Sequence, residues 1–244
     1  MTQQAGPPGT DATVTLRRFA DRGQLQRAIE ERLQQVLTGA DGQQPVVMLS
    51  GGSTPIPAYL ELATRALTPA AGLTILFSDD RYVPSDSDQS NYHQSRPLFT
   101  ALGLAPEQVL RIRTELPLAQ AASHSARQLE QLLLGGRRIN LGLLGIGADG
   151  HTCSLFSAAD LQRARGQFAI SVHRPDGRDA VTVTPTVLER VDQLIFLVAG
   201  SDKQGAVDGL LRRRPDLTAW AAVRGCRAAE VWADASALAA PGPG

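Results

Sequence analysis

Short apolar segments alternate with segments of helical periodicity along this chain of 244 residues, and this alternation limits the possible folds more than any other feature. The apolar segments cover residues 46–49, 73–77, 139–144, 168–172 and 194–198. Strands that are buried on both faces of a parallel sheet have this composition, because helices cover both sides of such a sheet. Apolar residues recur every three or four positions in residues 24–37, 56–67, 119–134 and 203–211, which predicts helices between the strands. The pattern therefore predicts an α/β fold with a mostly parallel sheet.

No long linker or internal repeat divides the chain, so we expect a single domain over residues 12–236, with flexible tails at residues 1–11 and 237–244. The 24 Lys and Arg residues balance the 24 Asp and Glu residues. This balance removes the basic footprint of a nucleic-acid-binding protein or of a polybasic membrane anchor, and we expect neither partner. No apolar run approaches the ~20 residues that span a bilayer, and the polar N-terminus lacks a signal sequence. We therefore expect a cytoplasmic protein.

The residues that most often bind metal ions are few and scattered. Two cysteines, Cys153 and Cys226, are also too few for a disulfide scaffold. The chain has four histidines and neither a C-x-x-C nor an H-E-x-x-H motif. We expect no metal site.

In a parallel sheet, ligands bind in the crevice beyond the C-terminal ends of the strands, so the residues that follow each strand are the candidates. Ser50-Gly51-Gly52-Ser53-Thr54-Pro55 follows the first apolar segment and precedes a predicted helix. Paired glycines bring backbone N–H groups close to a ligand, and a helix N-terminus capped by Ser53 or Thr54 is a ready site for phosphate. An ordinary capped turn is the alternative, and the lysine of a P-loop is missing.

Charged residues follow two further strands. Asp79-Asp80-Arg81 comes after residues 73–77, where two carboxylates and an arginine are costly unless they are paired or functional. Arg81 is suited to bidentate binding of an anion, and a surface cluster of ion pairs is the alternative. Lys203 follows residues 194–198 in the first turn of a predicted helix, where it opposes the helix dipole. An anionic ligand would explain that position, and a solvated lysine is the alternative.

The segment Gly145-Ile146-Gly147-Ala148-Asp149-Gly150-His151 follows the apolar residues 139–144. Its glycines match G-x-G-x-x-G, but it lies in mid-chain and no acidic residue follows at a strand end about 20 positions later, so we assign no dinucleotide site. Asp149 and His151 place an imidazole two residues from a carboxylate, which is suited to proton transfer near neutral pH. A lone histidine is more often structural, but the other three histidines have no comparable setting.

Taken in order, residues 50–55, 78–84 with 90–92, 145–156 and 200–203 resemble the 6-phosphogluconolactonases, and the likeness extends from residue 19 to residue 234. That family shares its fold with glucosamine-6-phosphate deaminase and, more distantly, with ribose-5-phosphate isomerase. The resemblance implies a doubly wound, Rossmann-like sheet of the sugar-phosphate isomerase, deaminase and lactonase type. It also implies a carboxylic ester hydrolase that converts 6-phospho-D-glucono-1,5-lactone to 6-phospho-D-gluconate in the oxidative pentose phosphate pathway, without a cofactor.

The resemblance assigns roles to individual residues. It makes His151 the catalytic histidine and Asp149 the acid beside it. It assigns to the small-molecule sugar phosphate Ser50, Gly51, Gly52, Ser53, Thr54, Asp79, Arg81, Asn91, Gly147 and Lys203. We expect a monomer or a weak homo-oligomer. The chain departs from the family at Asp80, where glutamate is usual, at Ser157, where proline is usual, and at residues 218–220, and the first departure leaves the role of Asp80 open.

Two other functions fit the same fold. Deaminases also carry Asp-Gly-His, but a segment like Ala-Phe-Asn-Glu follows it, and its glutamate takes part in ring opening; here residues 152–156 follow, with no acid before Asp160. A non-enzymatic sugar-phosphate sensor would keep the phosphate turn but would not need His151. We therefore favour hydrolysis by a water molecule that His151 activates. We expect the backbone N–H groups of residues 145–150 to stabilise the oxyanion, and neither cysteine to take part.

Overall fold

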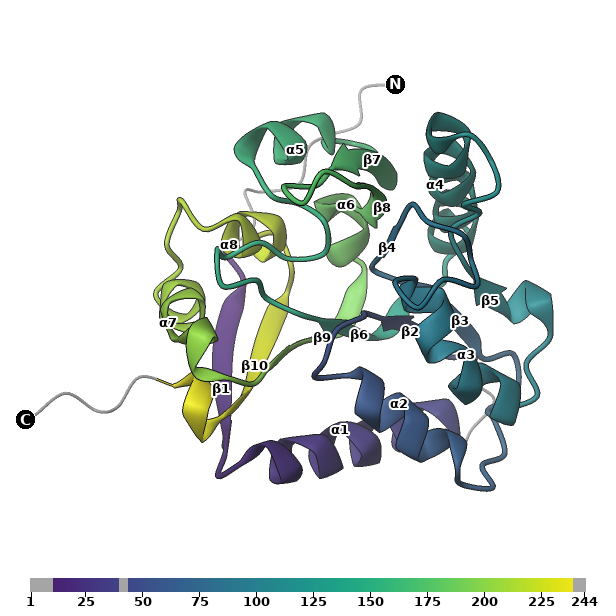
Figure 1. Ribbon diagram of the computed structural model, residues 1–244, viewed down its shortest axis with the longest axis horizontal. Helices are drawn as coiled ribbons and strands as arrows, with labels where there is room; N and C mark the ends of the chain where they lie inside the picture. The colour runs from purple at the N-terminus through teal and green to yellow at the C-terminus, as the bar shows by residue number, and fades with distance from the viewer. Residues whose placement is uncertain (1–10, 40–43, 239–244) are drawn as a thin grey trace, which may run out of the picture.

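The computed structural model describes residues 11–39 and 44–238 of the chain, and a seven-stranded sheet forms its centre (Figure 1). The strands of this sheet are β1 (Thr13–Phe19), β2 (Val46–Leu49), β3 (Thr74–Phe77), β5 (Val109–Leu110), β6 (Ile139–Leu144), β9 (Val191–Val198) and β10 (Ala228–Asp234). Their order is β1-β10-β9-β6-β2-β3-β5, and every neighbouring pair is parallel. The C-terminal ends of all these strands therefore lie along one edge of the sheet.

Helices cover both faces of this sheet. On one face lie α1 (Arg22–Leu37), α2 (Ile56–Ala63) and α3 (Asn91–Ala101). On the other lie α4 (Leu118–Leu134), α6 (Pro185–Leu188), α7 (Gln204–Leu211) and α8 (Thr218–Val223), and the short α5 (Ala158–Arg163) packs against α8. The two helical layers are separated by the sheet in Figure 1, with α1 and α2 below it and α4 and α6 above it. The predicted α/β fold with a doubly wound sheet is confirmed.

Alternate residues of the central strands supply the two cores. In β2, Val46 and Met48 pack on the side of α4, α7 and α8, whereas Val47 and Leu49 pack on the side of α1, α2 and α3. All four side chains are fully buried, and each burial of this kind contributes about 1.5–3 kcal/mol. Because both faces of β2 are covered, no polar residue interrupts its sequence.

Helix α1 illustrates how the helical periodicity is realised. Asp21 caps the helix, because its side chain accepts a hydrogen bond from the Gln24 backbone N–H at 2.7 Å. Leu25, Ile29 and Leu33 then fall on one side of the helix and are buried against the sheet.

A separate three-stranded sheet lies beside the main sheet. It consists of β4 (Asp79–Arg81), β8 (Asp179–Val183) and β7 (Ala169–His173) in the order β4-β8-β7, and both pairings are antiparallel. The prediction that residues 168–172 belong to the parallel sheet was therefore wrong, although a strand forms at nearly those residues. An apolar run indicates that a strand is buried, but it does not indicate which strands pair with it.

Other elements differ from the prediction in extent. The helix predicted over residues 56–67 ends at Ala63, and α7 begins at Gln204 instead of Lys203. The edge strand β1 was not predicted, because exposed and half-buried residues alternate along it and no apolar run marks it. Ala237, which the sequence assigned to the C-terminal tail, is buried in a short 3₁₀ helix. Residues 1–10 and 239–244 of the predicted tails lie outside the described residues.

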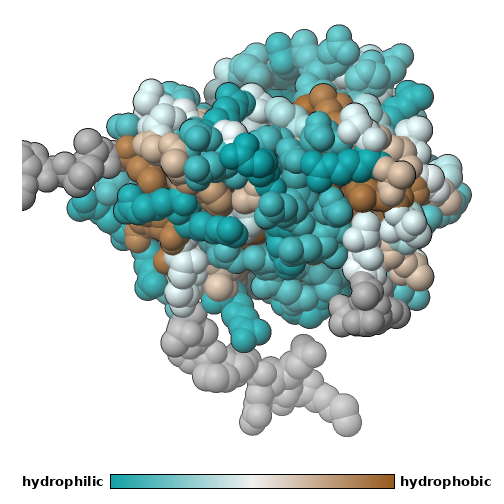
Figure 2. All heavy atoms as spheres, turned by 90° about the horizontal axis from the view of Figure 1, so that it is seen from below, coloured by the Kyte–Doolittle hydropathy of each residue, from teal (hydrophilic) through white to brown (hydrophobic). Residues whose placement is uncertain are grey.

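The surface on the side of α1 and α2 is predominantly hydrophilic, with separate smaller hydrophobic areas (Figure 2). In the described part of the chain, the exposed large hydrophobic side chains are Leu60 and Leu134. No helix within the same residues is long and apolar enough to cross a membrane.

Candidate active site

A cleft of about 300 Å³ lies at the C-terminal ends of β2, β3, β6 and β9, and a cavity of this size suits a small ligand. Every segment that was predicted to follow a strand end contributes to the wall of this cleft. The candidate residues that line it are Ser50, Gly51, Gly52, Ser53, Thr54, Asp79, Arg81, Asn91, Gly147, His151 and Lys203. The remaining candidate, Asp149, reaches the cleft through its contact with His151.

The turn between β2 and α2 lines the cleft and contains a buried hydroxyl. Ser50 is buried, and its Oγ has no hydrogen-bond partner among the described residues. The Tyr59 hydroxyl donates to the Ser50 carbonyl at 3.0 Å and fixes the start of the turn. The N-cap of α2 is Pro55 and no side chain accepts a capping hydrogen bond there, so the expected cap at Ser53 or Thr54 is not formed. No side chain therefore caps the first N–H groups of α2.

Asn91, the first residue of α3, connects this turn to Arg81. Its Oδ1 accepts a hydrogen bond from Arg81 Nη1 at 2.5 Å, and its Nδ2 donates to the Asp79 carbonyl at 2.9 Å. A Cβ on Gly51 would lie 1.9 Å from Asn91 Oδ1, so only glycine allows the turn to approach the amide this closely. Arg81 Nη1 also donates to the Gln89 carbonyl at 3.2 Å, so α3 and the loop before it hold the guanidinium at the wall of the cleft.

Asp79 and Asp80 point to opposite sides, because successive residues of a strand do so. Asp79 lines the cleft, and its carboxylate accepts hydrogen bonds from the hydroxyls of Ser78 at 2.8 Å and Ser154 at 2.7 Å. Asp80 is turned away from the cleft and accepts hydrogen bonds at the start of α3. Burial raises the pKa of Asp80 against the opposing effect of these hydrogen bonds.

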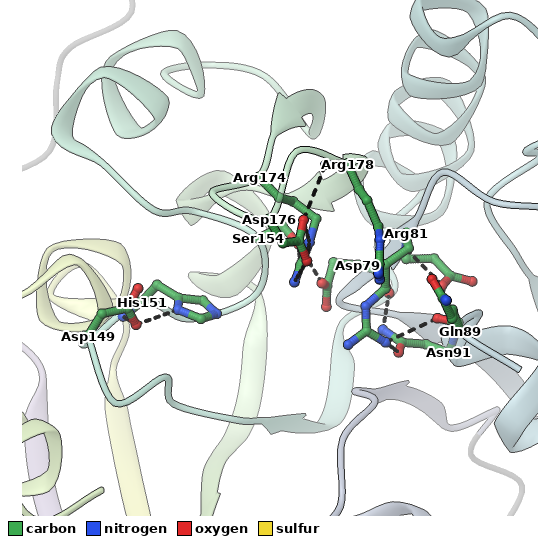
Figure 3. A network of polar contacts seen from close by, with 11 residues as sticks. Asp79, Arg81, Gln89, Asn91, Asp149, His151, Ser154, Arg174, Asp176 and Arg178 are labelled. Atoms are coloured by element: carbon green, nitrogen blue, oxygen red, sulfur yellow. Dashed lines mark hydrogen bonds and ion pairs between the residues drawn. The ribbon is translucent and has the colours of Figure 1, made fainter. Parts of the chain in front are cut away.

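His151 and Asp149 form a pair whose atoms are suited to proton transfer. The distance from His151 Nδ1 to Asp149 Oδ1 is 2.6 Å, and the imidazole packs against the Phe156 ring with 4.3 Å between the centroids. With Nδ1–H donating to the carboxylate, the neutral ring carries its free lone pair on Nε2. Partial burial would raise the pKa of Asp149, but the hydrogen bonds from His151 outweigh it and lower that pKa. Figure 3 shows the imidazole pointing from Asp149 toward the side on which Asp79 and Arg174 lie.

The glycine turn after β6 brings this pair together. A Cβ on Gly147 would lie 2.2 Å from both Asp149 Oδ1 and His151 Nδ1, so the missing side chain is what lets them meet. The Gly147 N–H donates to the His151 carbonyl at 2.8 Å, and the Gly150 N–H donates to the Gly147 carbonyl at 3.0 Å. The expectation that the N–H groups of residues 145–150 stabilise an oxyanion is therefore wrong for these two, because both are engaged within the turn.

Two further cations, Lys203 and Arg174, line the cleft. Lys203 is the N-cap of α7, its side chain is 26% exposed, and its Nζ lies 3.2 Å from Asp202 Oδ2. Arg174 comes from the turn between β7 and β8, and its side chain is 14% exposed. Figure 3 shows Arg174 beside Ser154, to which its Nη1 donates at 3.2 Å. Together with Arg81, these residues make the cleft suitable for an anionic ligand.

Arg174 was not predicted as a site residue, because the antiparallel pairing of β7 with β8 was not predicted. Nothing in the local sequence indicates that this turn reaches the strand ends of the other sheet. An arginine two residues before Asp176 predicts only the local ion pair that the two residues form at 3.1 Å.

The two cysteines lie in settings that suppress thiolate formation. Cys153 lines the cleft with a φ of 53°, and burial raises the pKa of its thiol well above the ordinary value. Burial also raises the pKa of Cys226, to about 12. That neither cysteine takes part in catalysis stays a prediction, and the raised pKa values of the two thiols support it. Within residues 11–39 and 44–238, no three His, Cys, Asp or Glu side chains gather in a way that could hold a metal ion.

The chain matches a family model described as glucosamine-6-phosphate isomerases/6-phosphogluconolactonase over residues 20–232. It is similar to the 6-phosphogluconolactonase of Thermotoga maritima, with 31% identity over 69% of this chain and 76% of that protein. It is also similar to the 6-phosphogluconolactonase of Rattus norvegicus, with 34% identity over 77% of this chain and 76% of that protein. The crystal structure of the 6-phosphogluconolactonase from Leishmania guyanensis superposes with a TM-score of 0.78 at 25% identity, over 92% of this chain and 97% of that one. Because the family model matches most of its length, the chain belongs to the family of glucosamine-6-phosphate isomerases and 6-phosphogluconolactonases.

Proposed function

We propose that this protein hydrolyses 6-phospho-D-glucono-1,5-lactone to 6-phospho-D-gluconate, as in the oxidative pentose phosphate pathway, without a cofactor. The observation that carries the proposal is the position of the His151–Asp149 pair in the same cleft as Arg81 and Lys203. The two similar relatives named above, both 6-phosphogluconolactonases, support it. We infer further that residues 12–236 form one domain, because residues from position 50 to position 203 share the cleft. A cytoplasmic location and a monomer or weak homo-oligomer belong to the same proposal.

The substrate is a cyclic ester, so its hydrolysis requires an activated water molecule and a protonated leaving oxygen. His151 Nε2 takes a proton from the water as the water oxygen bonds to C1. The bond between C1 and the ring oxygen then breaks, and the imidazolium returns the proton to that oxygen. The product is a carboxylic acid, which ionises and releases a proton to the solution. Asp149 stabilises the imidazolium through its contact with Nδ1, and general base catalysis of this kind contributes about 10²–10⁴-fold.

The phosphate end of the substrate lies, in this proposal, against the turn at residues 50–54 and between Arg81 and Lys203. The unpartnered hydroxyl of Ser50 supports this placement, because a buried hydroxyl without a partner costs free energy that a phosphate oxygen would recover. These contacts are remote from the bond that breaks. Their binding energy holds C1 against the attacking water.

Deamination of glucosamine 6-phosphate is the alternative on the same fold. The first acid after His151 is Asp160, and its carboxylate is already engaged in capping α5 with Ser157 and in an ion pair with Arg163 at 2.7 Å. It is therefore not available to assist ring opening, which favours the lactonase. The purified protein should accelerate acid release from freshly made 6-phosphogluconolactone and should release no ammonia from glucosamine 6-phosphate. Release of ammonia without lactone hydrolysis would reverse the assignment.

His151→Ala tests the chemical part of the proposal. Its kcat should fall by on the order of 10²-fold or more, while its affinity for 6-phosphogluconate stays close to that of the wild type. Proton release from the lactone, corrected for spontaneous hydrolysis, measures the first, and calorimetric titration measures the second. A folded variant that keeps more than half of the wild-type kcat would remove His151 from the mechanism.

Arg81→Ala and Lys203→Ala test the phosphate part. Each should lower kcat/KM for the phosphorylated lactone by about 10–150-fold, which corresponds to the roughly 1.5–3 kcal/mol of a charge-assisted hydrogen bond. Gluconolactone, which has no phosphate, is the matched substrate, and its slow hydrolysis should change little in either variant. Equal losses on the two lactones would show that Arg81 and Lys203 serve the fold or the chemistry instead of the phosphate.

A further inference from the structure

Asp80 is a buried carboxylate that the reaction described above does not use. It is 2% exposed and is not among the residues that line the cleft. Its Oδ1 accepts hydrogen bonds from the backbone N–H groups of Arg81 at 2.9 Å and Asn91 at 2.7 Å. Its Oδ2 accepts hydrogen bonds from the Ser90 hydroxyl at 2.8 Å and the Tyr92 N–H at 3.1 Å. These donors offset the cost of burying the charge.

Two of these donors are the first N–H groups of α3, which begins at Asn91. Such groups have no partner within their helix, and the positive end of the helix dipole favours a carboxylate beside them. Ser90 completes the cap, because its Oγ accepts a hydrogen bond from the His93 N–H at 3.2 Å. Asp80 therefore attaches the start of α3 to β4, the strand that also carries Arg81.

The side chain of Asn91 extends from this attachment point to the cleft. It accepts a hydrogen bond from Arg81 Nη1 and donates to the Asp79 carbonyl, as Figure 3 shows. It also lies so close to Gly51 that a Cβ there would be 1.9 Å from Asn91 Oδ1. A displacement at the start of α3 would move Asn91, and with it the support of the Arg81 guanidinium.

We propose that Asp80 is a positioning residue for the anionic end of the substrate, which acts through Asn91 on Arg81 without touching the substrate. This inference rests on the proposed function, because that function assigns Arg81 to the phosphate. Asparagine at position 80 would keep the shape of the side chain but would place an N–H₂ group against some of the present donors. The N-terminus of α3 would then shift or fray, and Arg81 would lose its fixed geometry.

A double-mutant cycle between positions 80 and 81 tests the proposal, with the affinity for 6-phosphogluconate measured by calorimetric titration. Asp80→Asn should weaken binding about tenfold in the wild-type background, and the coupling between the two positions is the part of this loss that depends on Arg81. In the Arg81→Ala background the same substitution should change the affinity less than about twofold. Equal losses in both backgrounds would overturn the proposal, and so would unchanged affinity in the wild-type background.

Asp160→Asn is a matched control, because Asp160 is also buried and also caps a helix N-terminus, that of α5. Both asparagine variants should lower the melting temperature, but only Asp80→Asn should change the ratio of KM values for phosphorylated and unphosphorylated lactone. A merely structural Asp80 would lower the melting temperature and leave that ratio as it is. If both variants changed the ratio equally, the positioning role would be refuted.

Ser90→Ala removes one of the four hydrogen bonds to Asp80. This variant replaces Asp80→Asn in the cycle if Asp80→Asn does not fold. It should weaken binding of 6-phosphogluconate in the same Arg81-dependent way, by a smaller factor, and a loss that persists without Arg81 would count against the proposal. The cycle measures binding and not turnover. A protein that binds the ligand with this coupling but does not hydrolyse the lactone would therefore confirm the role of Asp80 and refute the proposed function.

Discussion

Gly147→Ala should disable the enzyme without replacing a catalytic side chain. The added Cβ would lie 2.2 Å from Asp149 Oδ1 and from His151 Nδ1, whereas ordinary contact begins at 3.4 Å, so both groups must retreat by about 1 Å. Their hydrogen bond of 2.6 Å does not survive such a displacement. Loss of the orienting carboxylate costs about 10⁴-fold in kcat in a buried catalytic triad. Because the Asp149 side chain is 58% exposed and water partly replaces it, we expect a loss of about 10²-fold, or roughly 2.7 kcal/mol.

Two measurements check this prediction. Initial rates of proton release from the lactone give kcat, and long-range ¹H–¹⁵N spectra of the imidazole report whether Nδ1 still carries the proton. Gly205→Ala is the control, because a Cβ at that position meets no other heavy atom within 4 Å. A Gly147→Ala protein that folds, keeps more than half of the wild-type kcat and retains the Nδ1–H tautomer would refute the reasoning.

Three further predictions follow from the same contacts. Cys153→Ser should keep kcat within about twofold, because burial raises the pKa of the thiol and the water mechanism gives it no role; inactivity of a folded variant would contradict this. Gly51→Ala should raise KM at least about tenfold with a smaller loss in kcat, since the Cβ collides with the Asn91 amide, and an unchanged KM would show that this contact is not needed. The hydrogen bond from Arg111 lowers the pKa of Glu115 from 4.5 to about 2, so this carboxylate stabilises the fold above pH 4.5 and loses that effect as the pH falls to about 2. The difference in melting temperature between wild type and Glu115→Gln should therefore vanish over that range, and a constant difference would argue against the ion pair.

The buried strands β2, β3, β6 and β9 and the helices α1 and α4 were accessible from the sequence because each is a local pattern, whereas the buried strands β8 and β10 were not predicted. The apolar runs gave β2 and β6 with their observed bounds, and α1 and α4 were located to within about two residues. The choice of neighbouring strand is not a local property, and the apolar run that forms β7 was therefore assigned to the wrong sheet. The edge strand β1 has one face toward solvent, so its sequence lacks the continuous apolar run on which the prediction relied.

The site was predictable to the extent that parallel strands bring their ends together. This rule placed His151, Arg81 and Lys203 in one cleft although they are far apart in the sequence. It could not predict Arg174, which arrives from the second sheet. It also could not predict that Asp80 caps a helix, because this role depends on the distance between separate segments. The close approach of Asp149 and His151 to Gly147 depends on the conformation of a single turn, which the residue types alone do not reveal.

The pairing of β1 with β10 has a consequence for the order in which the chain folds. Thr13 lies opposite Ala228, so β1, which precedes the other described strands of the sheet in the chain, gains its neighbour only after β10, which follows them, has been synthesised. Strand pairing over such a separation is slow, because the loop must close before any contact forms. We expect a nascent chain that ends before β10 to expose β9 as an edge and to leave β1 unattached. The N-terminal strand would thus be among the last parts of the molecule to take its place.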